Sequence, residues 1–206
     1  MQDVIIVGAG GQGLIVADIL LLSREARPIG FVSDDAENRP REILGIPVLG
    51  TPDLLTRTPH DAIVIAIGDN RTRRVVTERL AAAGEIVITA RHPFTSIAPQ
   101  VTIGEGTMIS AGVVITPGAT IGRGVLLNTS CSIDHQSEIG DFAHVSVRGV
   151  IGANCTIGAE ALIALGAVVT SGRSVGARSV IGAGGIVVRD IGDDVTAYGV
   201  PAKVVR

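Results

Sequence analysis

The sequence predicts a mixed fold, in which a small parallel α/β domain is followed by a triangular solenoid of short parallel strands. Two patterns support this prediction. Strand-like apolar runs alternate with helix-like segments over residues 1–90, and an aliphatic residue then recurs at every sixth position. The composition agrees, because 46% of the 206 residues are apolar although the chain has no Trp, one Tyr and three Phe. Small and β-branched residues therefore carry the apolar content, as short β-coils require.

Residues 1–92 are expected to form the α/β domain. Its predicted elements are, in order, a strand over 4–7, a glycine-rich segment over 8–13, a helix over 14–22, a strand over 29–32, a strand over 62–67, a helix over 72–83 and a strand over 85–89. The join to the next domain is placed at Arg91-His92-Pro93, because Pro ends the preceding element and the six-residue rhythm begins soon afterwards.

Residues 93–206 are expected to form the solenoid. The recurring aliphatic positions run through fifteen consecutive hexads, and they are Ile97, Ile103, Ile109, Ile115, Ile121, Leu127, Ile133, Ile139, Val145, Ile151, Ile157, Ile163, Val169, Val175, Ile181 and Val187. The next residue is Gly in seven of these hexads, and the fifth is mostly small. Three hexads make one coil, so residues one coil apart stack at about 4.8 Å. The segment after Val187 leaves the rhythm and is expected to cap the prism.

Charge and cysteine usage exclude several classes of protein. The net charge is −3 and no Lys/Arg run is present, so nucleic acid is not an expected partner. The apolar start of the chain is too short to span a bilayer and has no basic region before it, so we expect a cytoplasmic protein that does not insert into membranes. Cys131 and Cys155 fall on inward positions and are expected to pack as reduced thiols.

The glycine-rich segment has the spacing of a phosphate-binding turn. Gly8, Gly10 and Gly13 follow a strand and open a helix, Gly11 lies between them, and acidic residues stand about 20 positions further on. Such a turn lets phosphate oxygens approach backbone N–H groups at a helix start. The pattern is typical of NAD sites, but any nucleotide diphosphate satisfies it, and glycines that serve strand–helix packing alone are the alternative.

Two histidines of the solenoid fall on outward positions. His135 is the third residue of its hexad and His144 the sixth, so neither ring is expected to fill the core. No metal is expected, because the other histidines precede the solenoid and a site made of His alone needs three. Ala153 stacks one coil above His135, so its N–H is a candidate donor to a developing oxyanion. Asn128 either supports the site or is a turn asparagine.

Several stretches resemble a known family. They are Leu127-Asn128-Thr129-Ser130, Ile133-Asp134-His135, the run from Ile139 to Ser146, Gly199-Val200-Pro201-Ala202-Lys203, the loop over 8–13, Asp34-Asp35, and the run from Ile65 to Asn70. The chain is similar over almost its whole length to bacterial sugar acetyltransferases that act on UDP-linked 4-amino sugars, as in the bacillosamine pathway, or on sialic acid.

The resemblance implies a Rossmann-like nucleotide-sugar-binding domain, a left-handed parallel β-helix, and acetyl-CoA as the cosubstrate of a homotrimer. His135 would be the general base, His144 would lie near the thioester, and Lys203 would contact CoA. The nucleotide sugar would lie against the residues that follow the strands of the first domain, which are Gly8, Gly10, Gly11, Gly13, Asp34, Asp35 and Ile67.

The chain departs from the family pattern at two positions. Gln136 stands where an acidic residue commonly follows the catalytic His, so Asp134 or Asp141 substitutes for that acid or the base is weaker. Gln12 replaces a His of the glycine loop, which affects the sugar preference. An amine needs less help from a base than a hydroxyl, so N-acetylation is preferred. The alternatives are O-acetylation of a sugar such as sialic acid, and a non-enzymatic NAD-responsive module.

Overall fold

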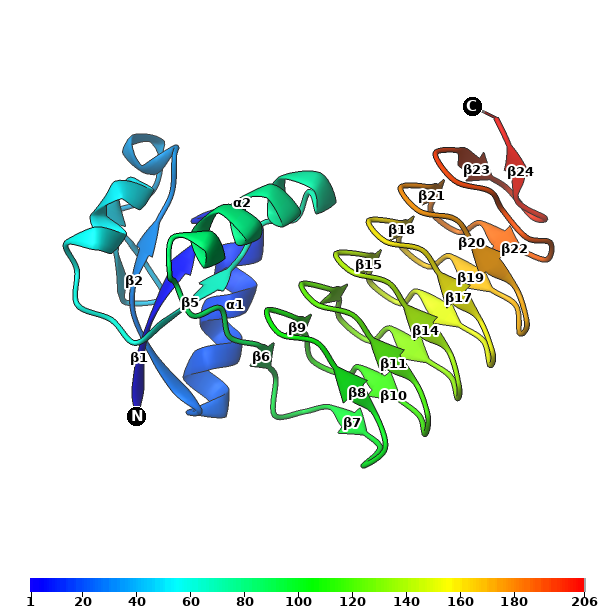
Figure 1. Cartoon of the computed structure of the whole chain (residues 1–206), viewed down its shortest axis with the longest axis horizontal. Helices are drawn as coiled ribbons and strands as arrows, with labels where there is room; N and C mark the ends of the chain where they lie inside the picture. The colour runs from blue at the N-terminus through cyan, green and yellow to red at the C-terminus, as the bar shows by residue number, and fades with distance from the viewer. Residues whose placement is uncertain (206) are drawn as a thin grey trace. The chain divides into compact units, whose positions relative to one another are not determined.

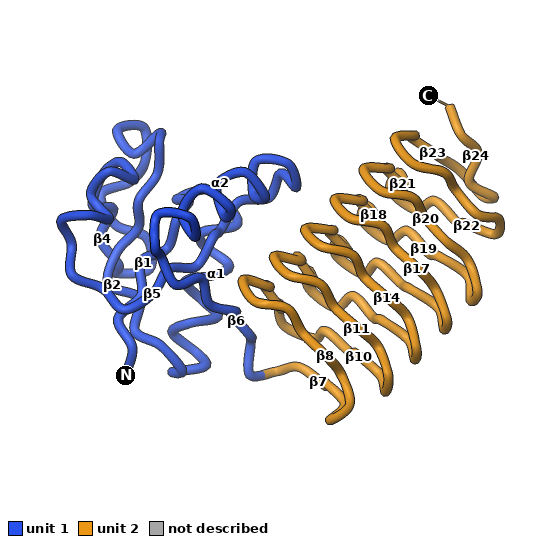
Figure 2. The backbone as a smooth tube through the Cα atoms, in the orientation of Figure 1, with its two compact units in different colours: residues 1–93 blue, residues 94–206 orange. Residues whose placement is uncertain are grey.

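The computed structural model describes residues 1–205. The chain forms two compact units, residues 1–93 (unit 1) and residues 94–206 (unit 2), shown in Figures 1 and 2. The division falls one residue after the join expected from the sequence.

Unit 1 is a five-stranded sheet with two α-helices. Its elements are β1 (Gln2–Val7), α1 (Gly11–Ser23), β2 (Ala26–Val32), η1 (Ala36–Asn38), β3 (Glu42–Ile43), β4 (Ile46–Gly50), η2 (Pro52–Thr56), β5 (Ala62–Ile65), α2 (Asn70–Ala82) and β6 (Ala90–Arg91). The strand order is β3-β4-β2-β1-β5, with only β3 antiparallel to its neighbour, and β6 lies outside this sheet. Val4, Ile5 and Ile6 of β1, which lies between β2 and β5, are fully buried, as expected for a parallel sheet. The carboxyl ends of β1, β2 and β5 therefore lie side by side.

Unit 1 differs from the sequence prediction in two segments. The Pro-rich stretch before residue 62 contains a strand that was not expected, β4, which pairs with β2 while Pro47 lies on the β3 side of the hairpin. An interrupting Pro hides such an edge strand from pattern reading. Conversely, residues 85–89 form no strand, because only Val87 makes an isolated bridge, to Ile63.

Unit 2 is a parallel β-helix with three flat faces. The first face carries β7 (Ser96–Ile97), β10 (Val114–Ile115), β13 (Ser132–Ile133), β16 (Val150–Ile151), β19 (Val168–Val169) and β22 (Ile186–Val187). The second carries β8 (Thr102–Ile103), β11 (Thr120–Ile121), β14 (Glu138–Ile139), β17 (Thr156–Ile157) and β20 (Ser174–Val175). The third carries β9 (Met108–Ile109), β12 (Leu126–Leu127), β15 (His144–Val145), β18 (Leu162–Ile163), β21 (Val180–Ile181), β23 (Thr196–Tyr198) and β24 (Lys203–Val204).

Every strand of the fifteen hexads ends on a recurring aliphatic residue, so the rhythm predicted the strands one by one. These residues form a single core with small residues of the fifth hexad positions, including Cys131 and Cys155. Some fifth positions carry hydroxyls that satisfy the backbone inside the prism. The Ser137 Oγ donates to the Gly152 carbonyl at 2.7 Å and accepts the Cys155 N–H at 3.1 Å. These inward polar groups are therefore structural.

The last coil departs from the spacing of the others. Ile181 pairs with Ala197 and Val175 with Ile191, so this coil has 16 residues instead of 18. Ile191 and Ala197 still belong to the core. The segment after Val187 thus completes one shortened coil before β24 turns back antiparallel to β23.

Candidate active site

Two glycines of the loop after β1 are required by packing. Gly8 has φ +113°, and a Cβ there would lie 2.6 Å from the Ala66 carbonyl oxygen, while a Cβ on Gly13 would collide with the Gly8 carbonyl. Gly10 and Gly11 have open space around their Cα atoms. The loop therefore combines both interpretations of its pattern: Gly8 and Gly13 bring strand and helix together, and Gly10 and Gly11 leave the start of α1 accessible to a ligand.

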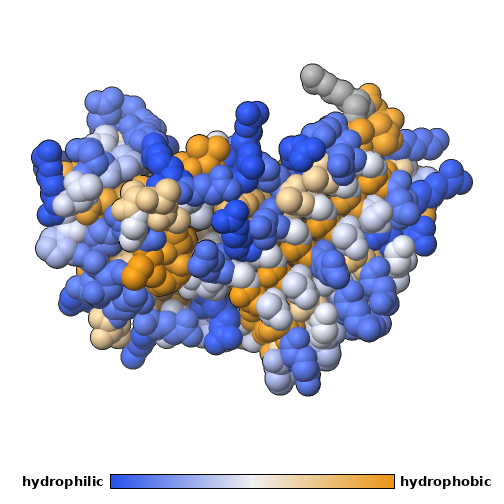
Figure 3. All heavy atoms as spheres, viewed as in Figure 1, coloured by the Kyte–Doolittle hydropathy of each residue, from blue (hydrophilic) through white to orange (hydrophobic). Residues whose placement is uncertain are grey.

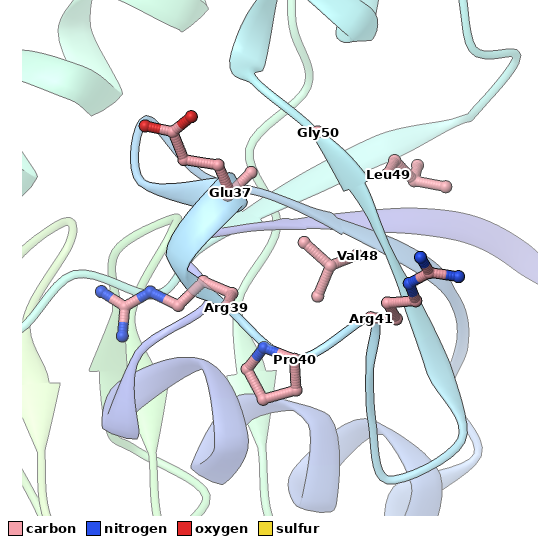
Figure 4. A pocket seen from close by; sticks show the side chains of 8 residues that line it. Glu37, Arg39, Pro40, Arg41, Val48, Leu49 and Gly50 are labelled. Carbon is pink, nitrogen blue, oxygen red and sulfur yellow. The ribbon is translucent and has the colours of Figure 1, made fainter.

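Of the two acidic residues after β2, Asp34 and Asp35, only Asp35 has its side chain fixed by the partners described here. Asp34 is exposed, whereas the Asp35 carboxylate accepts a hydrogen bond from the Asn38 amide and pairs with Arg39 at 3.0 Å. A cavity of about 310 Å³ begins next to Asp35, between η1 and β4. In Figure 4 Val48 and Pro40 lie between Arg39 and Arg41, whose guanidinium groups point to opposite sides. This cavity has an apolar floor and a charged rim.

The loop after β5 is held by a buried arginine that the sequence analysis did not single out. Arg73 is fully buried and donates to the carbonyls of Ile67 and Gly68 at 3.0 Å and to the Asn70 Oδ1 at 2.8 Å. An Arg on a helix normally points to solvent, so the amino-acid sequence around Arg73 does not predict that this side chain is buried. The only available signal was the Gly-Asp-Asn turn, whose carbonyls need donors. Ile67, a predicted substrate contact, is thus fixed through its backbone.

His135 lies on the exposed turn between β13 and β14, next to one orienting group. Its Nδ1 is 3.3 Å from the Gln136 Oε1. An amide oxygen that accepts from Nδ1–H leaves Nε2 without a proton and able to act as a base. Gln136 has φ +57°, and the equivalent residue one coil above, Asn154, has φ +55°. Gln136 thus contacts the ring from a turn position that recurs along the prism.

The two carboxylates that were alternatives to Gln136 are occupied elsewhere. The Asp134 Oδ1 accepts the His135 backbone N–H at 2.7 Å and the Thr116 hydroxyl at 3.1 Å. These hydrogen bonds and the nearby His135 lower the pKa of Asp134. Asp141 lies on another turn and pairs with Arg123 at 3.1 Å. Among the described residues Gln136 is therefore the predicted orienting group that contacts the ring.

The other predicted residues divide between the site of His135 and other parts of the prism. Ala153 stacks directly above His135, and its N–H donates to the Ser171 Oγ at 3.1 Å. Asn128 lies at a different corner, where its Oδ1 accepts the Thr129 N–H at 2.8 Å, a local turn bond. His144 lies on the third face in β15, paired with the neighbouring strands at Leu126 and Leu162.

Lys203 is exposed on β24 opposite Tyr198. One chain thus groups His135 with Gln136 and Ala153, but it places Asn128, His144 and Lys203 on other turns or faces.

Both cysteines are free thiols buried in the prism. Burial raises the pKa of the Cys131 thiol to about 12, and the Cys155 Sγ donates to the Thr170 carbonyl at 3.3 Å inside the prism. Over residues 1–205 no group of three or more His, Cys, Asp or Glu side chains is arranged to hold a metal ion. Neither helix of the same region is long and apolar enough to cross a bilayer.

Comparison with known proteins relates both units to sugar acetyltransferases. Residues 3–80 match the family described as the PglD N-terminal domain. Perosamine N-acetyltransferase from Caulobacter crescentus, solved with CoA and GDP-perosamine, has a TM-score of 0.93 and 33% identity over 99% of this chain and 97% of its own. The acetyltransferase domain of PglB from Neisseria gonorrhoeae has a TM-score of 0.94 and 33% identity over 100% of both chains. The chain belongs to the bacterial sugar N-acetyltransferases.

This family membership confirms the resemblance seen in the sequence and the predicted fold class, a Rossmann-like domain followed by a left-handed parallel β-helix. The family is one of acyltransferases, and the Neisseria gonorrhoeae domain has also been solved with acetyl coenzyme A. UDP-N-acetylbacillosamine N-acetyltransferase from Bacillus subtilis is 32% identical over 113 residues, which are 54% of this chain and 52% of that enzyme. The chain therefore matches about half the length of this curated relative.

Proposed function

We propose that this chain transfers the acetyl group of acetyl-CoA to the amine of a nucleotide-linked amino sugar, with His135 as the general base. The observation that carries the proposal is the exposed His135 ring, held through Nδ1 by a neutral amide in a chain that matches sugar N-acetyltransferases from end to end.

In the proposed reaction His135 Nε2 takes the proton of the attacking amine. The amine nitrogen bonds to the thioester carbonyl carbon while the π electrons move to oxygen. When that pair returns, the C–S bond breaks, and the departing CoA thiolate receives the proton from the imidazolium. The products are an N-acetyl sugar and CoA. Holding both substrates beside His135 supplies much of the rate, and proton transfer contributes about 10²–10⁴-fold.

The nucleotide of the sugar is assigned to the carboxyl edge of the sheet in unit 1. Ligands of parallel sheets bind outside the carboxyl ends of the strands. The open Gly10 and Gly11 at the start of α1 suit the diphosphate, and Asp34 and Asp35 suit the ribose hydroxyls. The next strand outward is β4, so the base would extend toward the cavity beside it.

The proposed assembly is a homotrimer that completes each site with a neighbouring chain. Three observations support it. Outward residues of the second face are polar, whereas the first face presents Val114 and Val150, each 39% exposed. Figure 3 also shows a stripe of apolar residues along unit 2, flanked by polar ones. In addition, His135 and His144 lie on different parts of one prism, so a partner's third face can bring His144 toward His135. Lys203 would contact CoA from β24, the strand that follows the last coil.

We place the enzyme in the cytoplasm, where acetyl-CoA is available and the buried Cys131 and Cys155 stay reduced. Its product would be a donor for glycan biosynthesis. The test is release of the CoA thiol with GDP- and UDP-linked 4-amino sugars, free sialic acid and no acceptor, with products identified by mass spectrometry. N-acetylated nucleotide sugar supports the proposal. Acetylated sialic acid would select the O-transfer alternative, and NAD binding without any transfer would select the non-enzymatic module.

A further inference from the structure

At the corner of the prism that carries His135, the next two coils toward the C-terminus place small residues at the equivalent position. The backbone hydrogen bonds of successive turns, Asn154 N–H to the His135 carbonyl at 2.9 Å and Gly172 N–H to the Ala153 carbonyl at 2.8 Å, stack His135, Ala153 and Ser171 in successive coils. Consecutive coils are about 4.8 Å apart. An acetyl group that reacts beside His135 therefore meets the turn of Ala153 next.

The Ser171 hydroxyl reaches down to that turn. Its Oγ accepts the Ala153 N–H at 3.1 Å. Gly152 allows this close approach, because a Cβ at position 152 would lie 2.7 Å from the Ser171 backbone nitrogen and 2.8 Å from its Oγ. Ser171 belongs to the second coil above His135, and this hydrogen bond ties its oxygen to the Ala153 turn of the first. The Ala153 N–H is thus used by a side chain that is itself exposed to solvent.

At another corner of the prism, a turn N–H also donates to the side chain of the equivalent residue one coil above, but there the acceptor is a carboxylate. Asp141 accepts the Arg123 N–H at 3.0 Å, and Asp193 accepts the Ala177 N–H at 2.8 Å. A carboxylate only accepts, so those bonds leave no donor facing outward. A serine hydroxyl accepts and still has an O–H to donate. Within residues 1–205 Ser171 donates to no other protein group, and its side chain is exposed to solvent.

We propose that Ser171 is a catalytic residue whose O–H donates to the thioester carbonyl oxygen of acetyl-CoA. This inference rests on the proposed function. As the amine bonds to the carbonyl carbon, negative charge gathers on that oxygen, and a hydroxyl donor stabilises it more than the neutral carbonyl. The Ala153 N–H, bonded behind the same hydroxyl, polarises its O–H and holds it in place. Ala153 thus acts through Ser171 rather than directly on the thioester.

Infrared spectroscopy of bound [1-13C]acetyl-CoA tests the proposal without the sugar. A hydrogen bond lowers the stretching frequency of the carbonyl, so the wild-type protein and Ser171→Thr should show a lowered band, and Ser171→Ala should lose that shift. Steady-state rates should agree, with kcat about 10²-fold lower in Ser171→Ala and KM for the sugar unchanged. Asp193→Ala is the matched control, because it removes the same type of turn bond at another corner and should keep both the band and the rate.

The outcomes separate the two levels of the argument. If calorimetry detects no acetyl-CoA binding to the wild-type protein, the proposed function fails. If acetyl-CoA binds and Ser171→Ala leaves the band and kcat unchanged, the Ala153 N–H serves the thioester directly, and the role of Ser171 is refuted while the function stands. Equal losses in Ser171→Ala and Asp193→Ala would also refute it, because loss of the turn bond alone would then explain both.

Discussion

Removing the imidazole of His60 should destabilise unit 1 more at low pH than at high pH. His60 Nδ1 lies 2.7 Å from the Thr58 carbonyl and Nε2 lies 2.8 Å from the Glu85 carboxylate. Both ring nitrogens therefore face acceptors, and only the protonated ring donates to both. Burial opposes the charge, but the Thr58 carbonyl and Glu85, with Asp61 nearby, outweigh it and raise the pKa of His60 above the usual 6.5.

The sign of the effect follows from that shift. Below pH 6.5 the ring is protonated in both the folded and the unfolded chain, so the pair contributes fully. The contribution is lost as pH rises through the raised pKa of the folded protein. The side chains of His60 and Glu85 are 8% and 18% exposed, so solvent screens the pair little. A hydrogen bond to a charged group contributes about 1.5–3 kcal/mol, which sets the expected magnitude.

Urea unfolding of the wild-type protein and His60→Gln, at about pH 5.5 and about pH 8.5, measures this contribution. The loss of unfolding free energy in His60→Gln should be larger at the lower pH by about 1.5 kcal/mol or more. His135→Gln is the control for loss of an imidazole at an exposed position, and it should change the free energy of unfolding by no more than about 0.5 kcal/mol at either pH. An equal loss in His60→Gln at both pH values, or an NMR titration midpoint below 6.5, would refute the reasoning.

Three further predictions concern the active site and the glycine loop. His135→Ala should lower kcat by about 10²-fold or more, the usual contribution of a general base, and wild-type rates would exclude that role. Gln136→Glu should shift the alkaline rise of kcat/KM to higher pH, because a carboxylate at Nδ1 favours the imidazolium; an unmoved profile would reject Gln136 as the orienting group. Glu160 already has φ +58° at an equivalent turn position, so Glu is compatible with this backbone. Gly8→Ala should destabilise the protein by about 1–3 kcal/mol in urea unfolding, whereas Gly11→Ala, with open space at its Cα, should cost little.

The β-helix was predictable in detail because its period is strict. A repeat of six fixes which side chains point inward, and three repeats fix which residues stack, so Ala153 could be placed above His135 without coordinates. The α/β unit has no such period, and the strand β4 was missed because Pro47 interrupts its apolar run. Residues 85–89 looked like a strand by composition, but their backbone forms a single isolated bridge, in which Ile86 and Ile88 hydrogen-bond to Ile63.

The site was predictable only to the level of backbone register. The register puts Ser171 in the same column as His135, but it cannot tell that the Ser171 hydroxyl turns down to take the Ala153 N–H. In the same way, the sequence offered Asp134, Asp141 and Gln136 as partners for the His135 ring. The choice between them depends on rotamers and on competing hydrogen bonds, because Asp134 is used by the backbone N–H and Asp141 by Arg123.

The shortened last coil also bears on how the protein avoids polymerising. A solenoid that simply stops exposes a row of unpaired backbone groups, onto which another chain's first coil can stack end to end. Here the tail folds back over that end. The Ile186 N–H donates to the Gly199 carbonyl at 3.0 Å, the Ala202 N–H donates to the Ile186 carbonyl at 2.7 Å, and β24 covers β23 in antiparallel pairing. Truncating the chain before Gly199 would therefore expose unpaired backbone groups of the last coil, and we expect the truncated protein to form fibres.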